Sequence, residues 1–149
     1  MLDKCKMKKR YSASVEERGA RMREMIKRLL DAELKIMMII WEAKGSVTSA
    51  YIMEKLKGEE TWGQTTVLNF LSRLVDRGFL KHEKEGKSNL YTPIIEEEVY
   101  LESESKSFLE RLHGNSIRSL ISALYKGHAL KKEDLEELQA FIEEKTKGE

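Results

Sequence analysis

The sequence predicts a mainly α-helical protein with a small β-hairpin, organised as a winged helix-turn-helix domain followed by a C-terminal helical segment. Apolar residues recur at helical spacing over most of the chain. Between residues 79 and 93 the pattern changes to two short extended runs around a glycine. One proline against nine glycines also favours helices joined by short, glycine-marked turns.

Composition limits the size and the setting of the protein. With 149 residues, 40% hydrophobic and 36% charged, the chain suffices for one compact domain plus an oligomerisation segment, but not for two enzyme-sized domains. Cys5, the single cysteine, has no intramolecular disulfide partner, and no signal-peptide pattern is present. The longest apolar run, Ile36 to Trp41, is too short to cross a membrane. We therefore expect a cytoplasmic protein without membrane insertion.

Charge is distributed unevenly, although the net charge is only +1. Residues 1–28 carry ten Lys and Arg against four Asp and Glu, residues 29–93 carry nine of each, and residues 94–149 carry eight against thirteen. A basic beginning and an acidic end suit a protein that presents one end to a polyanion. Solvated helix faces would explain such runs equally well.

We expect residues 1–29 to form a basic N-terminal extension. Residues 1 to about 13 have no clear period, whereas Val15 to Leu29 has the pattern of a charged helix. The run KCKMKKR, Lys4 to Arg10, has two interpretations: an arm that follows DNA phosphates or enters the minor groove, or a solubilising tail that contacts nothing.

Residues 30–93 have the pattern of a winged-helix DNA-binding domain. We expect one helix from an N-cap at Asp31 to a stop at Gly45, a second from Ser49 to Lys57 behind an N-cap at Thr48, and a third from about Gln64 to Arg77 before Gly78. Two strands follow, Phe79 to Lys84 and Ser88 to Pro93, and the glycine of Glu85-Gly86-Lys87 can supply a positive φ between them.

Residues 94–149 are expected to form a helical dimerisation segment. Three amphipathic helices, broken at Gly114-Asn115 and at Gly127, carry too few large apolar residues to enclose a core alone. Pairing with a second copy would bury their stripes, whereas folding back onto the winged helix would bury only some; we favour the second copy. The predicted interface consists of Val99, Leu101, Phe108, Leu109, Leu112, Ile117, Leu120, Ile121, Leu124, Leu135, Leu138, Phe141 and Ile142.

Several motifs resemble those of the penicillinase-repressor (BlaI/MecI) family. The resemblance is carried by WGQTTV, LSRLVDRGFL and KEGKSNLYTP within residues 61–93. It extends upstream through DAELKIMMIIWEAKGSVTSAYI and downstream to DLEELQAFIEE, over roughly residues 30 to 144. It implies a homodimeric repressor without enzyme activity that binds a double-stranded DNA operator and controls β-lactamase or related stress and resistance genes. Because a twofold dimer reads two half-sites in opposite senses, we expect the operator to be an inverted repeat.

The third helix and the wing are the predicted DNA-contacting elements. Thr65 and Thr66 lie in the first turn, where amides and hydroxyls can meet phosphate or bases. Asn69 can read adenine with its amide, and Arg73 can reach a phosphate. The complete predicted set is Thr48, Ser49, Gln64, Thr65, Thr66, Leu68, Asn69, Arg73, Lys84, Lys87, Asn89 and Tyr91.

Some of these residues have a second interpretation. Arg73 could instead form a surface ion pair with Asp76 or Glu33. Leu68 stands where the family commonly has a basic residue; it could contact thymine methyl groups or belong to the core, and residue statistics favour the core. The family's usual serine and proline at the start of this helix are Gly63 and Gln64 here.

No enzyme motif, metal site or cofactor is expected. His82, His113 and His128 lie in separate elements without partners at metal-ligand spacing, and the tail EEKTKGE lacks the cysteines of copper-responsive relatives. In antibiotic-responsive members of the family a membrane sensor protease system leads to cleavage at an Asn-Phe bond. The corresponding residues here are Ala123 and Leu124, so induction by the same cleavage is not implied.

A function of another class is also compatible with the sequence. The winged helix could be a protein-interaction module with the acidic C-terminal segment as its working surface. That alternative predicts protein partners that bind independently of salt, and no retention on heparin.

Overall fold

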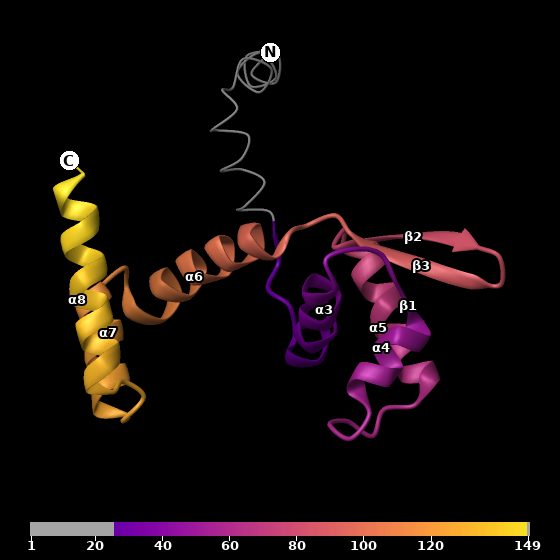
Figure 1. The fold of residues 1–149 in the computed structure, drawn as a ribbon, viewed down its shortest axis with the longest axis horizontal. Coiled ribbons are helices and arrows are strands. Elements are labelled where there is room, and N and C mark those ends of the chain that lie inside the picture. Colours follow the sequence, from indigo (N-terminus) through magenta and orange to yellow (C-terminus); the bar gives the residue numbers. More distant parts are fainter. Residues whose placement is uncertain (1–25, 149) are drawn as a thin grey trace, which may run out of the picture. The chain divides into compact units, whose positions relative to one another are not determined.

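The computed structural model describes residues 26–148, which fall into two compact units (Figure 1). The first unit ends at Glu104 and the second begins at Ser105. The basic run Lys4 to Arg10, and the part of the expected helix that precedes residue 26, lie outside the described residues. The expected boundary after residue 93, between a DNA-binding domain and a dimerisation segment, remains a proposal.

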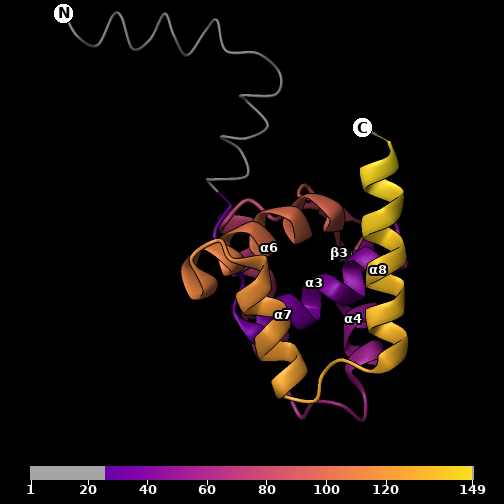
Figure 2. The same cartoon turned by 90° about the vertical axis from the view of Figure 1, so that its left-hand side faces the viewer.

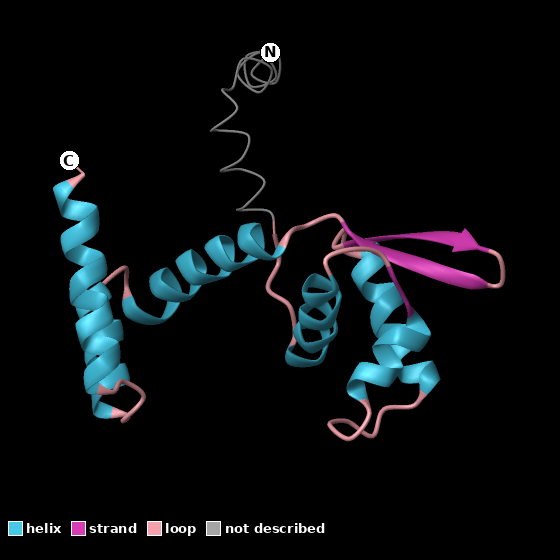
Figure 3. Cartoon of the chain, viewed as in Figure 1, coloured by secondary structure: helices cyan, strands magenta, loops and turns pink. Residues whose placement is uncertain are grey.

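The first unit has the element order of a winged helix (Figure 3). Its elements are α3 (Asp31–Ala43), β1 (Val47–Thr48), α4 (Ser49–Leu56), α5 (Gln64–Asp76), β2 (Leu80–Glu85) and β3 (Ser88–Pro93). All three strands are antiparallel, with β3 in the middle, and the β2–β3 hairpin projects beyond the helices (Figure 1). The mainly helical fold with a small wing is therefore confirmed, and β1 is an addition to it.

The core of the first unit is built from one face of each helix and from the base of the hairpin. Side chains spaced three and four residues apart share a helix face, and these are the ones that the structure buries. The most deeply buried are Ile36, Met37, Ile40, Ile52, Val67, Leu71, Leu74, Phe79 and Leu80. Ile95 and Tyr100, which follow the wing, are also buried against this core.

Two helix ends differ from the expected positions by one residue. Leu30, not Asp31, is the N-cap of α3, and the left-handed residue after α3 is Lys44, with φ 55°, rather than Gly45. The predicted N-cap at Thr48 is confirmed, since its hydroxyl accepts the Tyr51 N–H at 3.2 Å. The turn of the hairpin uses Gly86 at φ 63°, a conformation that favours glycine.

Residues 26–30 are not helical, so the expected helix up to Leu29 is wrong over this stretch. Their backbone groups bond to side chains, two of which come from distant elements, instead of to one another. The N–H groups of Leu29 and Leu30 donate to the Tyr100 hydroxyl and to the Glu33 carboxylate, and the carbonyl of Arg28 accepts from Arg77. Leu29 itself is buried in the core.

Three helices follow the wing: α6 (Glu97–His113), α7 (Ile117–Lys126) and α8 (Lys132–Lys147). Helix α6 begins in the first unit and continues without a break into the second. Within the second unit, α8 runs back in the opposite direction to α7 (Figure 2). Among residues 105–148 the structure buries no side chain, which leaves the apolar stripes of these helices uncovered within a single chain.

Candidate nucleic-acid interface

Helix α5 has one face in the core and the opposite face in solvent. Val67, Leu71 and Leu74 are fully buried. One half-turn away, Thr65 and Asn69 are exposed. Hydroxyl and amide groups on an outward helix face are those that can meet base edges in the major groove of DNA.

The N-terminus of α5 offers free backbone donors. Its N-cap, Gly63, has no side chain to accept the first amides of the helix. Gln64 follows, where a proline would lack an N–H group. The departure from the family pattern at these two positions therefore adds an amide donor to the positive end of the helix dipole, which favours a phosphate group.

The loop before α5 is fixed from two sides. Trp62 packs its ring against Phe70 of α5, with ring centroids 5.2 Å apart. Glu60 accepts a hydrogen bond from the Lys35 ammonium of α3 at 2.8 Å, and this contact is the main cause that raises the pKa of Lys35. Both contacts hold the start of α5 in a defined position on α3.

The wing has two faces with different charge. Alternate residues of a strand point to opposite faces, and directly paired residues share a face. His82 pairs with Tyr91, and Lys84 pairs with Asn89, so Lys84 lies on the face of the buried Tyr91 ring. Glu83 and Glu85 lie on the other face of β2. The face that is continuous with the core is thus cationic at its outer end, whereas the opposite face carries Glu85 and a Lys81–Glu83 ion pair at 3.8 Å.

The predicted DNA-contacting residues differ in exposure. Gln64, Thr65, Asn69, Arg73, Lys84, Lys87 and Asn89 are exposed, whereas Thr48, Ser49 and Thr66 are half-buried. Leu68 is 36% exposed, so the structure contradicts its assignment to the core. Tyr91 is only 6% exposed, and its ring supports the wing from below.

Arg73 does not pair with Glu33, which was one alternative for it. Glu33 pairs instead with Arg77, which lies four residues after Arg73; the distance from the guanidinium nitrogen to the carboxylate oxygen is 2.5 Å. No ion pair involves Arg73 within the part of the chain that the structure describes, and its side chain stays exposed on α5. Its charge is therefore available to a phosphate group.

Three exposed polar residues near this surface were missed in the sequence. Ser72 lies on the outward face of α5, three residues after Asn69, and helical spacing could have identified it. Tyr51 and Lys55 lie on the exposed side of α4, with the Lys55 ammonium 5.6 Å from the Tyr51 ring centroid. In helix-turn-helix domains the helix before the recognition helix crosses the DNA backbone.

Of the thirteen predicted dimer residues, six are exposed and seven are half-buried. Leu101, Phe108 and Leu112 recur on one side of α6 and are 50%, 36% and 63% exposed. Ile117, Phe141 and Ile142 are exposed as well. The half-buried residues include Leu109, Leu120, Ile121, Leu124, Leu135 and Leu138. Val99 differs from the rest because it packs against the core of the first unit.

Ala123 and Leu124 lie in the last turns of α7, not in an extended segment. Their carbonyls accept hydrogen bonds from the N–H groups of Gly127 and Ala129 at 2.9 Å each. Cleavage between them would require this turn to open locally.

Comparison with known proteins assigns the chain to a family. Residues 29–144 match the penicillinase repressor family, and the chain belongs to it. It is 34% identical over 119 residues to a penicillinase repressor of Bacillus licheniformis, covering 80% of this chain and 92% of that protein. It is 26% identical over 114 residues to the methicillin resistance regulatory protein MecI of Staphylococcus aureus strain N315, covering 76% and 92% of the two chains.

A solved structure with a similar sequence is that of monomeric Bacillus licheniformis BlaI in complex with the blaP half-operator. It is 36% identical, covers 50% of this chain and 90% of that chain, and superposes with a TM-score of 0.44.

The described residues contain neither a membrane-spanning helix nor a cluster of metal-binding side chains. Between residues 26 and 148 no helix is long and apolar enough to cross a bilayer. Nor do His, Cys, Asp and Glu side chains of that range gather in groups of three or more that could hold a metal ion.

Proposed function

We propose that this protein is a cytoplasmic, homodimeric transcriptional repressor that binds operator DNA sequence-specifically, at an inverted repeat. The proposal rests on helix α5, which has a polar outward face and an N-terminus without a side-chain cap. Membership of the penicillinase repressor family supports it, since the family is named for repression.

Each surface group has a distinct proposed role. Thr65, Thr66 and the first amides of α5 bind phosphate at the groove edge, and Asn69 reads a base. Leu68 reaches a thymine methyl group, because it is exposed and apolar. Arg73 and the wing face with Lys84 and Asn89 bind the flanking phosphates.

Dimerisation is proposed through residues 105–148 and the outer face of α6. A segment without a single buried side chain cannot retain defined helix packing by itself, since its apolar area stays in water. A second copy would present the same apolar stripes and close the contact symmetrically. Counted from residue 94 to residue 149, thirteen acidic side chains stand against eight basic ones, which keeps this end of the chain away from DNA.

The proposal includes regulation by a membrane sensor protease system. The relative MecI is named for methicillin resistance, which fits control of a resistance gene. Cleavage at Ala123–Leu124 should be slow in the folded protein, because both carbonyls accept hydrogen bonds from the turn that follows α7.

The test uses the DNA upstream of the protein's own gene. Fluorescence anisotropy should give tighter binding to an inverted repeat from that region than to its scrambled sequence, with affinity that falls as salt rises. Arg73→Ala should weaken binding to both sequences and reduce the slope of log affinity against log salt by about 0.9 if one phosphate contact is lost. Lys147→Ala, an exposed change at the end of α8, is the control.

Equal and weak binding to both sequences, insensitive to salt, would contradict the proposal. That result would instead favour a protein-interaction module.

A further inference from the structure

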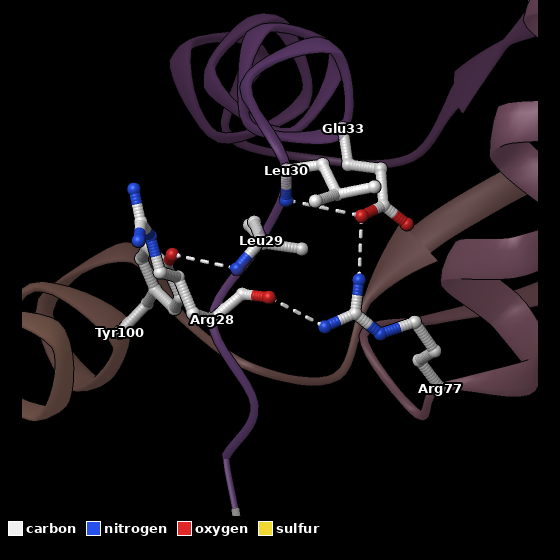
Figure 4. Close-up of polar contacts among 6 residues, drawn as sticks. All are labelled: Arg28, Leu29, Leu30, Glu33, Arg77 and Tyr100. Carbon is white, nitrogen blue, oxygen red and sulfur yellow. Dashed lines mark hydrogen bonds and ion pairs between the residues drawn. The ribbon is translucent and has the colours of Figure 1, made fainter.

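The chain just before α3 is held by side chains from two directions (Figure 4). The Arg77 guanidinium donates to the carbonyl of Arg28 at 2.7 Å and to the Glu33 carboxylate at 2.5 Å. The Glu33 carboxylate also accepts the Leu30 N–H at 3.1 Å. From the other direction, the Tyr100 hydroxyl accepts the Leu29 N–H at 3.0 Å. We call Arg28, Leu29, Leu30, Glu33, Arg77 and Tyr100 the clasp.

Leu29, Glu33 and Tyr100 of the clasp are buried, whereas Arg28 and Leu30 are exposed. Glu33 is 1% exposed and the Arg77 side chain 25%, so each charge depends on the other for compensation. Burial raises the pKa of Tyr100, because it disfavours the charged phenolate. A buried polar network of this kind contributes more to a unique geometry than to stability.

The clasp joins the end of α5 to the start of α6. Arg77 is the C-cap of α5, and its guanidinium lies 5.5 Å from the Phe79 ring centroid. Tyr100 lies in the first turns of α6, with its ring 5.6 Å from Trp41 and 5.9 Å from Phe79. Three residues of extended chain therefore connect the recognition helix to the helix that leads into the second unit.

We propose that Arg77 and Tyr100 are positioning residues that fix the direction of α6 relative to α5 and thereby set the half-site spacing that the dimer accepts. The inference rests on the proposed function. Two recognition helices must enter the major groove about 34–36 Å apart, or a near multiple of this distance. Helix α6 has 17 residues, hence a length of about 25 Å. A tilt of about 10° at its base would displace its far end by roughly 4 Å.

Tyr100→Phe tests the inference, because it removes the hydroxyl and keeps the aromatic ring in the core. We measure affinity for a full inverted repeat, for the same repeat with one or two base pairs added or removed between the half-sites, and for a single half-site. We expect the full repeat to bind about five- to tenfold more weakly, with a smaller penalty for altered spacing and unchanged half-site affinity. Tyr125→Phe, an exposed tyrosine in α7, is the matched control.

Other outcomes separate the inference from the proposed function. If the unsubstituted protein does not prefer the repeat, the proposed function fails. If Tyr100→Phe weakens the half-site and the full repeat equally, or leaves the spacing preference unchanged, the positioning role is wrong. Should Tyr100→Phe not fold, as judged by its thermal transition, Arg77→Lys replaces it, because lysine cannot bond to both acceptors in the fixed geometry of arginine. Arg118→Lys, exposed in α7, is its control.

Discussion

Asn69, the residue proposed to read a base, has an amide that can form two hydrogen bonds with adenine. Asn69→Ala should relax the preference at one position in each half-site, because alanine cannot make the two hydrogen bonds by which an amide reads adenine. We expect discrimination at that position to fall by about 1–3 kcal/mol. Competition between operator variants measures the loss, with Gln139→Ala in α8 as an exposed amide control. An unchanged ranking of the variants would exclude Asn69 from base readout.

At the scale of residues, helical spacing predicts which side chains face outward but not which partners they find. Thr65 and Asn69 are exposed as their spacing from Val67 and Leu71 requires. The choice between Arg73 and Arg77 as partner of Glu33 could not be made from the sequence. Both arginines lie on adjacent parts of α5 and its C-cap, and only the position of α3 selects Arg77.

Leu68 illustrates a second limit. It lies at the edge of the apolar stripe of α5, where packing of neighbouring elements decides between burial and exposure. General statistics for leucine favour the core, whereas the structure leaves it 36% exposed.

Among the elements, the wing gives a prediction with an internal control. Lys84→Gln should weaken DNA binding and lower the salt slope by about 0.9, because one phosphate contact is lost. Glu83→Gln changes the adjacent residue on the opposite face of β2 and should leave the slope unchanged. Titrations at several salt concentrations measure both. If Glu83→Gln strengthened binding as much as Lys84→Gln weakened it, the wing would act only through its total charge.

Elements with a strong local pattern were predicted well. Helices α4 and α5 and the β2–β3 hairpin lie within one or two residues of their expected bounds, because caps, glycines and periodicity act locally. The Leu30 N–H has a local partner in Glu33, but Arg28 and Leu29 are held by the distant Arg77 and Tyr100. Similarly, β1 is a two-residue strand that pairs with Tyr91 and Leu90 far along the chain.

For the whole molecule, the apolar side of α6 gives a test of the dimer. Leu112→Glu should produce monomers, because a carboxylate would have to be buried without a partner in the proposed interface. The monomer itself should stay folded, since Leu112 is already 63% exposed. Sedimentation velocity measures the mass, and Arg111→Glu, the adjacent exposed residue, is the control. A persistent dimer of Leu112→Glu would place the interface elsewhere.

The division of the molecule was harder to predict than its elements. The sequence suggests a boundary after residue 93, where the strand pattern ends and the acidic helices begin. The compact units divide after Glu104, because Ile95, Val99 and Tyr100 pack on the core of the winged helix. Burial of the first turns of α6 depends on Trp41 and Phe79, and such long-range contacts leave no periodic signal in residues 94–104.

The unbroken course of α6 has a consequence for how the protein folds. Starting a helix is costly and extending it is cheap, so the turns held by Tyr100 act as a template for the rest of α6. Neither glycine nor proline interrupts it between Glu97 and His113. In a monomeric variant, amide hydrogen exchange should therefore quicken steadily from Leu101 towards His113, whereas in the dimer the whole helix should exchange slowly and at a similar rate. Assembly would then complete a helix that the DNA-binding unit has already begun.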